Sequence, residues 1–257
     1  MKFLCLPGGY CSAKCNEAFA GFDLTGAPAV GPGPFCDSLT SNGEARFFFT
    51  QGTTPVYPPP EYEGFFGPPP NFTFAEPDGP SKFNMRDFPK RDTPEATMKD
   101  ALELAGQPTF SNIRLVVDRL IGILDSDEDI AGVIGYSEGA EMAASLILEE
   151  QRRHKESGRE PRLKCAVLMC GWPPMDPVTG QVVLADEHFG EEIINIPTCH
   201  VIGAADPFLD ASMALYNLCD PDSAELFDHG GGHVIPRTKK TVDDLTGVVR
   251  DMILSVG

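Results

Sequence analysis

The sequence predicts one α/β domain over residues 1–257, with a mostly parallel sheet covered by helices on both faces. Short apolar runs typical of buried strands alternate with amphipathic segments typical of helices, and this alternation favours parallel strands joined by crossover helices. A length of 257 residues fits a single such domain. The net charge of −18 argues against a nucleic-acid partner, because binding to phosphates needs a basic surface.

Six short, mostly apolar runs are the predicted strands of this sheet. Strands that are buried on both faces have this composition rather than a strict alternation of polar and apolar residues. The predicted strands are residues 2–6, 45–49, 130–134, 163–169, 198–202 and 224–227.

Helices are predicted between most of these strands from their start signals. Thr93 is expected to cap a helix that has Pro94 at its first position. Ser111 is expected to open the amphipathic run at 113–124. For the last helix, the pair Thr241 and Asp244 resembles a capping box.

The segment 51–110 is the exception to this alternation. It is dense in proline and aromatic residues and shows no sustained helical or strand period. Since it follows a predicted parallel strand, it leaves the carboxyl edge of the sheet, where ligands bind in open α/β folds. We expect this insertion to form a rim or lid over the active site. The alternative is a surface excursion packed by its own aromatic side chains.

A candidate nucleophile elbow lies where the strand at 130–134 meets a helix, and its residues are Gly135-Tyr136-Ser137-Glu138-Gly139. The pattern G-x-S-x-G alone is weak, but a sharp turn from strand to helix needs small residues on both sides of an exposed serine. The helix N-terminus also points free amide groups at the serine oxygen. The context therefore predicts Ser137 as a nucleophile, against the plainer interpretation of a glycine turn before a core helix.

Two later loops supply the partners that a serine nucleophile needs. The glycine-rich loop after the last strand holds His233, the predicted base, with His229 as the alternative. The turn after the preceding strand holds Asp206, the predicted acid that orients the base, with Asp210 as the substitute. The chain order of serine, aspartate and histidine is the order found in α/β-hydrolases.

The oxyanion that forms during acyl transfer needs two backbone donors. We expect one from the amide of Glu138, the residue after the nucleophile. The other is expected from the amide of Gly9, or of its neighbour Tyr10, in the loop after the first strand. Neither a P-loop nor a G-x-G-x-x-G pattern occurs there, so a phosphate site is not favoured.

Several motifs spread along the chain occur together in one known family. They are Leu-Pro-Gly-Gly at 6–9, Gly-Tyr-Ser-Glu-Gly-Ala at 135–140, Leu-Met-Cys-Gly-Trp-Pro at 168–173, Gly-Ala-Ala-Asp-Pro at 203–207 and Gly-Gly-His-Val-Ile-Pro at 231–236. With these motifs the chain resembles the fungal serine hydrolase family, the FSH-type α/β-hydrolases. The resemblance implies esterase or thioesterase activity without a cofactor. Many similar members are encoded beside fungal polyketide synthases and release the finished acyl chain from the acyl carrier protein.

Two positions depart from the family pattern. Members commonly begin the first loop with His-Gly, where this chain has Pro7 and Gly8. Gln is frequent after the nucleophile, where this chain has Glu138. A carboxylate facing the pocket would oppose the oxyanion, so we expect the side chain of Glu138 to point away from it.

These observations predict a serine hydrolase that forms an acyl-enzyme and cleaves a thioester or ester with a sizeable apolar acyl group. The aromatic insertion favours a large substrate, and the candidate pocket residues are Tyr10, Phe65, Phe66 and Trp172. Three alternatives stay open. They are a carboxylesterase for small soluble esters, an acyltransferase that uses the same triad and, least favoured, a non-catalytic binding protein.

An acyl carrier protein is the expected partner, and docking to such an acidic protein needs a local basic surface. Residues 82–91 lie in the insertion on the active-site side and are the preferred surface. Residues 152–164 are richer in basic side chains, but they follow the elbow helix and are expected at the opposite edge of the sheet.

The cysteines and the first residues complete the prediction. The chain has eight cysteines, of which several fall inside predicted strands and none forms a C-x-x-C pair, so we expect reduced thiols and no metal site. The apolar run at 1–7 is too short for a signal peptide, and no segment has the ~20 apolar residues of a membrane span. A cytoplasmic location is expected.

Overall fold

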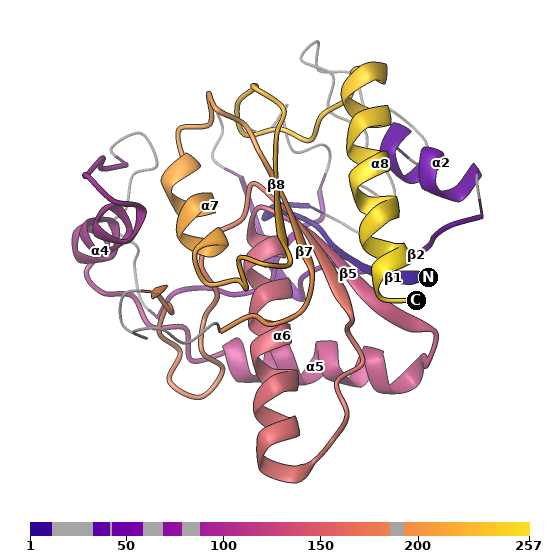
Figure 1. The fold of residues 1–257 in the computed structure, drawn as a ribbon. Coiled ribbons are helices and arrows are strands. Elements are labelled where there is room, and N and C mark those ends of the chain that lie inside the picture. Colours follow the sequence, from indigo (N-terminus) through magenta and orange to yellow (C-terminus); the bar gives the residue numbers. More distant parts are fainter. Residues whose placement is uncertain (12–32, 42, 59–68, 79–87, 186–192) are drawn as a thin grey trace.

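The computed structural model describes residues 1–11, 33–41, 43–58, 69–78, 88–185 and 193–257 (Figure 1). Its main feature is a six-stranded sheet with the order β2-β1-β5-β6-β7-β8, in which each neighbouring pair is parallel. The strands are β1 (Lys2–Leu6), β2 (Arg46–Phe49), β5 (Ile130–Tyr136), β6 (Cys165–Met169), β7 (Thr198–Ile202) and β8 (Ala224–Asp228).

Helices cover both faces of this sheet (Figure 1). One face packs against α5 (Ile113–Ser126) and α6 (Glu138–Ser157), and the other packs against α2 (Pro34–Ser41) and α8 (Lys239–Ser255). Side chains in β1 alternate between the two cores, with Leu4 and Leu6 in the first and Phe3 and Cys5 in the second. This alternation follows from the period of two in a strand, so both faces of the strand are apolar.

Two further helices lie beside the first face. They are α4 (Pro94–Leu104) and α7 (Leu209–Tyr216), which pack against each other. Their shared apolar contacts include Met98, Phe208 and Ala211. No helix in the described part of the chain is both long and apolar enough to cross a membrane.

The predicted fold class is confirmed, and each predicted strand matches a strand of the sheet to within two residues at either end. Two strands of the insertion were not predicted. They are β3 (Thr54–Val56) and β4 (Asn71–Thr73), which form a separate antiparallel pair. Strands of three residues among prolines are too short to show a period, so the sequence pattern could not reveal them.

The predicted helix caps agree with the structure at one helix and differ from it at another. The Thr93 cap is confirmed, since its hydroxyl oxygen accepts a hydrogen bond from the amide of Ala96 at 3.2 Å. The capping box at Thr241 is wrong, because the last helix begins earlier and Thr238 is its cap. The side chain of Asp244 instead forms an ion pair with Lys240 at 2.7 Å.

The predicted role of Ser111 is also wrong. Helix α5 begins at Ile113 after Asn112, and no side chain caps it. The hydroxyl of Ser111 donates a hydrogen bond to Asp78 at 2.6 Å, and its amide donates to the same carboxylate at 3.1 Å. Ser111 therefore binds the insertion to the start of α5 instead of capping the helix.

The strand order reverses its direction between β1 and β5. The chain passes from β1 outward to β2 and then returns to β5 on the other side of β1, and ligands bind at such a reversal in open α/β sheets. Leu6 at the end of β1 is in register with Gly135 near the end of β5. The loops that follow these two strands are therefore neighbours at the carboxyl edge.

Candidate active site

Ser137 occupies a strained turn between the end of β5 and the start of α6. Its backbone has φ of 53° and ψ of −119°, a conformation that costs free energy for any residue with a side chain. Its amide donates to the carbonyl oxygen of Met169 at 2.9 Å. A Cβ atom at Gly135 would lie 2.3 Å from the carbonyl oxygen of Gly139, and one at Gly139 would lie 2.1 Å from that of Leu6. Only glycine fits at both positions.

The structure brings the three predicted triad residues together. The Nε2 atom of His233 lies 3.0 Å from the Oγ atom of Ser137, and its Nδ1 atom lies 2.8 Å from the Oδ2 atom of Asp206. These loops follow β5, β7 and β8 at the same edge of the sheet. The Asp206 side chain is 1% exposed, whereas that of His233 is 23% exposed. A buried carboxylate therefore holds an imidazole whose other nitrogen faces the serine.

Neighbouring residues hold the imidazole and the carboxylate in place. The hydroxyl of Tyr136 donates to the carbonyl oxygen of His233 at 2.9 Å. The amide of Phe208 donates to the Oδ1 atom of Asp206 at 2.8 Å, and the Phe208 ring lies perpendicular to the imidazole with 5.4 Å between ring centroids. We did not predict either role, although Tyr136 lies inside the elbow motif and Phe208 directly follows the Asp-Pro turn.

The two alternative residues lie outside this arrangement. Asp210 accepts a hydrogen bond from the hydroxyl of Thr97 at 2.9 Å, which joins α7 to α4. The Nδ1 atom of His229 accepts from the amide of Gly231 in its own loop at 3.2 Å. Burial lowers the pKa of His229. Among the described residues, neither side chain forms a hydrogen bond with Ser137.

The predicted loop of the oxyanion hole lies beside the nucleophile. A Cβ atom added to Gly8 would lie 3.4 Å from that of Ser137. The carbonyl oxygen of Tyr10 accepts a hydrogen bond from the side-chain amide of Asn71 at 2.8 Å, so β4 of the insertion supports this loop. The assignment of the Gly9 and Glu138 amides to the oxyanion stays a prediction.

The carboxylate of Glu138 is bound by the insertion. Its Oε1 atom accepts hydrogen bonds from the Thr73 hydroxyl and from the amides of Phe74 and Ala75, the latter two at 2.9 and 3.0 Å. Its Oε2 atom is buried and has no hydrogen-bond partner among the described residues. Burial raises the pKa of Glu138 to about 7, against the lowering effect of these three hydrogen bonds.

This raised pKa predicts a pH-dependent stability. Between pH 4.5, the ordinary pKa of glutamate, and about 7, the folded chain keeps a proton that the unfolded chain has lost. The contribution to the free energy of unfolding is therefore complete below pH 4.5 and lost as the pH rises to about 7. The loss is at most about 3 kcal/mol.

The variant Glu138→Gln, which is neutral at every pH, is expected to lack this loss. Denaturant unfolding at pH 4.5 and at about pH 7 measures the difference. Relative to the native chain, the variant is expected to gain up to about 3 kcal/mol in free energy of unfolding at the higher pH. The control is Glu160→Gln, on an exposed side chain. Equal changes for the native chain and for Glu138→Gln would contradict the assignment.

Three side chains of the site offer atoms that metals also bind. One ligand atom each from Cys170, Asp206 and His233 lies within 4.8 Å of the others. The spacing between Asp206 and His233 is that of a hydrogen bond, and Cys170 lies against this pair. Burial raises the pKa of the Cys170 thiol, and the charge of Asp206 adds to this effect. These three side chains are therefore better described as a hydrogen-bonded pair, Asp206 and His233, with the neutral thiol of Cys170 beside it.

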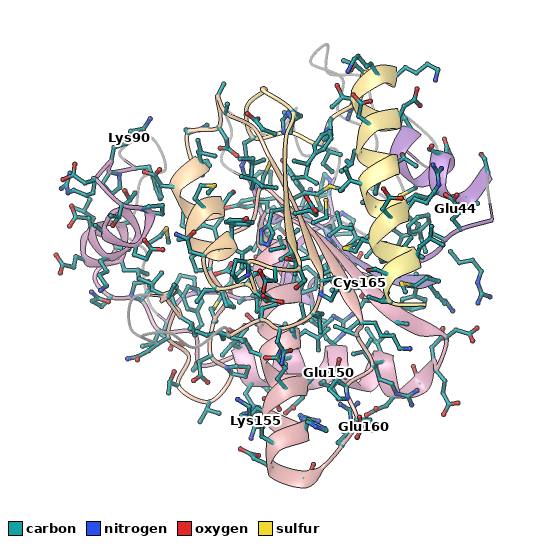
Figure 2. The ribbon with its side chains drawn as sticks, in the orientation of Figure 1. Glu44, Lys90, Glu150, Lys155, Glu160 and Cys165 are labelled. Carbon is teal, nitrogen blue, oxygen red and sulfur yellow. The ribbon has the colours of Figure 1, made fainter. Side chains whose placement is uncertain are left out.

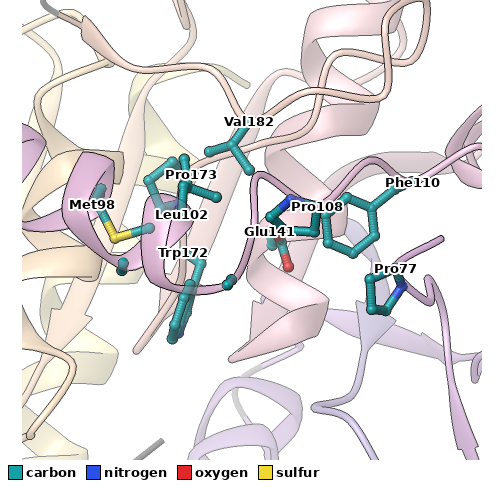
Figure 3. Close-up of a pocket in the computed structure, with 11 residues that line it drawn as sticks. Pro77, Met98, Leu102, Pro108, Phe110, Glu141, Trp172, Pro173 and Val182 are labelled. Carbon is teal, nitrogen blue, oxygen red and sulfur yellow. The ribbon is translucent and has the colours of Figure 1, made fainter. Parts of the chain in front are cut away.

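An apolar pocket of about 140 Å³ lies next to the site (Figure 3). Trp172, a predicted pocket residue, lines it. The Trp172 ring contacts Phe208 with 5.7 Å between centroids, and Phe208 in turn contacts His233. Of the other candidates, Tyr10 lies in the loop beside the nucleophile, and Phe65 and Phe66 lie outside the described residues.

The fold and this arrangement define a class of protein. A parallel sheet between two helix layers, with serine, aspartate and histidine on loops at its carboxyl edge in that chain order, is the organisation of an α/β-hydrolase. Residues 43–245 match the family described as Serine hydrolase (FSH1). The chain belongs to this family.

Relatives found by sequence agree with this assignment. Esterase FPY3 of Fusarium mangiferae is 33% identical over 147 residues, which cover 55% of this chain and 65% of the relative. Hydrolase phiM of Talaromyces stipitatus is 30% identical over 135 residues, which cover 51% and 54%. The chain thus spans between half and two thirds of the length of these relatives.

Two solved structures share the fold. The crystal structure of Arabidopsis thaliana SOBER1 superimposes with a TM-score of 0.51 and 17% identity, covering 98% of this chain and 99% of the other. The crystal structure of esterase PE8 gives a TM-score of 0.50 and 16% identity, covering 98% and 92%. At such identities the likeness concerns the fold alone.

Proposed function

We propose that this chain hydrolyses an acyl thioester or ester through a covalent intermediate on Ser137. The observation that carries the proposal is the continuous chain of hydrogen bonds from the Ser137 hydroxyl through His233 to Asp206. The family and the printed names of the relatives, esterase and hydrolase, support the same reaction.

The reaction has two halves. His233 accepts the hydroxyl proton as Ser137 attacks the carbonyl carbon, and the tetrahedral intermediate collapses when the leaving thiol or alcohol takes that proton. Water then attacks the acyl-enzyme, giving its proton to His233, and the serine leaves with that proton as the free acid forms. In both halves the amides of Gly9 and Glu138 are the proposed donors to the oxyanion.

The acyl group is proposed to be largely apolar. The pocket beside Trp172 holds about 140 Å³, and an apolar cavity of similar size in another protein binds a benzene-sized molecule. The substrate proposed here is a polyketide-type acyl chain carried by an acyl carrier protein, and the reaction releases it. A carboxylesterase acting on small soluble esters is the second candidate, because relatives bear the name esterase.

Chemical labelling tests the nucleophile directly. A fluorophosphonate probe is expected to modify the native chain at Ser137, which peptide mapping identifies, and to leave Ser137→Ala unmodified. His233→Ala is expected to slow the labelling strongly, because the serine then lacks its base. Equal labelling of the native chain and Ser137→Ala would refute the proposed function.

The two basic segments differ in their availability to a carrier protein. The arginines within 152–164 all form ion pairs with carboxylates of α5, α6 and the loop before β5. In the preferred segment, residues 82–87 lie outside the described residues, Arg91 pairs with Asp100, and Lys90 is exposed. Figure 2 shows Lys90 projecting near α4, with Lys155 at the far end of α6.

The variant Lys90→Glu is expected to raise the KM for a carrier-bound acyl substrate about two- to tenfold and to leave the KM for a free thioester unchanged. The reason is that a rim charge mainly steers the encounter with an acidic partner. Lys155→Glu is the matched control, because Lys155 lies about 25 Å along the helix from Glu138. Equal effects of the two variants would argue against docking at Lys90.

A further inference from the structure

The wall of the apolar pocket contains one ionisable side chain next to the nucleophile. Glu141 lies in the first turn of α6, and its amide donates to the carbonyl oxygen of Ser137 at 3.3 Å. Ser137 itself lies outside the helix in the strained turn, so this backbone contact, and not the helical period, places Glu141 next to the nucleophile. Figure 3 shows Glu141 among the apolar side chains of Trp172, Pro108 and Phe110.

The Glu141 side chain is partly exposed, and the pocket that it lines is otherwise apolar. The other described residues that line the pocket are Pro77, residues of α4 and its C-cap Ala105, the segment at 108–110 and the segment at 172–182, and none carries an ionisable side chain. No described residue forms a hydrogen bond with the Glu141 carboxyl. Burial raises the pKa of Glu141 well above its ordinary value, and the charge of Glu138 raises it further.

Stability of the fold does not explain why a glutamate stands at position 141. A partly exposed carboxyl group that lines an apolar pocket and has no described partner stabilises the fold less than an apolar side chain of similar size would. A carboxylic acid that stays neutral can donate a hydrogen bond, as a buried acid does in the oxyanion hole of ketosteroid isomerase. A polar group at this place, in an otherwise apolar pocket, is the pattern of a site that selects its ligand.

The pocket also borders the catalytic residues on two sides. Glu141 forms its wall one helical turn from Ser137, and on another side the rings of Trp172 and Phe208 connect it to the His233 imidazole. An acyl group bonded to the Ser137 oxygen and extending into the pocket would place its first carbons beside the carboxyl group.

We propose that the Glu141 carboxyl donates a hydrogen bond to a carbonyl or hydroxyl oxygen on the acyl chain and thereby selects oxygenated acyl groups over saturated ones. This inference rests on the proposed function, since it names the substrate class of the same site. A site built around such a hydrogen bond discriminates against a substrate without the oxygen, because the bound acyl chain then covers the donor and leaves it unpaired.

The test compares thioesters of N-acetylcysteamine with acyl chains of one length: octanoyl, 3-oxo-octanoyl and 5-oxo-octanoyl. The native chain is expected to favour at least one oxo substrate over octanoyl by about tenfold in kcat/KM. Glu141→Leu is expected to lose this preference and to hydrolyse the octanoyl substrate faster than the native chain. A variant that is merely misfolded would lose activity on every substrate.

A second variant separates the charge from the hydrogen bond. Glu141→Gln keeps a neutral donor, so it is expected to retain most of the preference at all pH values. The native chain is expected to lose the preference as the pH rises and Glu141 ionises. This comparison supports the proposal even if Glu141→Leu does not fold.

Two outcomes overturn the proposal in distinguishable ways. If the probe labels Ser137 and octanoyl is hydrolysed but neither oxo substrate is favoured, the inference about Glu141 fails and the proposed function stands. The same holds if Glu141→Leu is active and keeps the preference. If the probe does not label Ser137, both fail.

Discussion

Replacing Ser137 with alanine is expected to lower kcat by about 10⁴- to 10⁶-fold, with the fold retained. The three triad residues act as a unit, so removing the nucleophile removes nearly all that the triad contributes, and the oxyanion donors alone leave a small residual rate. Steady-state hydrolysis of an activated ester, with far-ultraviolet circular dichroism to confirm folding, measures the effect.

The matched control for this variant is on the same helix. Ser157 lies at the last position of α6, and its hydroxyl donates to the carbonyl oxygen of Arg153 within the same helix. Ser157→Ala is expected to keep the native kcat. A fall of less than tenfold for Ser137→Ala would mean that another group performs the hydrolysis.

The second large effect is expected from Asp206→Asn, which should lower kcat by about 10⁴-fold. In the native chain, Oδ1 of Asp206 accepts from the Phe208 amide and Oδ2 accepts from Nδ1 of His233. An asparagine that keeps the first bond turns its NH₂ group toward Nδ1. The imidazole must then carry its proton on Nε2, the atom that faces Ser137, and can no longer accept the hydroxyl proton.

Asp210→Asn is the control that decides between the two aspartates. Its side chain is bound to Thr97 on α4, so the variant is expected to change kcat only a few-fold. If Asp210→Asn were the more damaging variant, the assignment of Asp206 would be wrong. The pH profile of kcat/KM adds a second readout, because Asp206→Asn removes the base form of His233 and a purely structural defect does not.

The sheet and the position of Ser137 could be predicted because their signals are local. Most of the strands are short, mostly apolar runs, and parallel strands all end at the same edge. Loops that follow different strands must therefore meet there, which is why Asp206 and His233 could be placed beside Ser137 despite their separation in the chain. The choice of Asp206 over Asp210 followed from its position directly after β7.

The supports of the site could not be predicted, because they join distant residues in ways that no local pattern encodes. Asn71 and Thr73 bind the first loop and the elbow from a strand too short to show a period. The same limit applies to Glu141, whose place on a helix was predictable but whose apolar surroundings come from α4 and the segment after β6. Helix starts failed where two candidate caps lie close together, as at Thr238 and Thr241.

The hydrogen bonds between Glu138 and residues 73–75 give the insertion a part in holding the elbow. The amide of Glu138 is one proposed oxyanion donor, and its side chain accepts hydrogen bonds from the amides of Phe74 and Ala75. Asn71 donates to the carbonyl oxygen of Tyr10, in the loop that carries the other proposed donor, Gly9. Deleting residues 71–75 to admit bulkier acyl groups would thus remove the support of both proposed oxyanion donors. Engineers who want a wider opening should alter side chains around Trp172 and leave 71–75 whole.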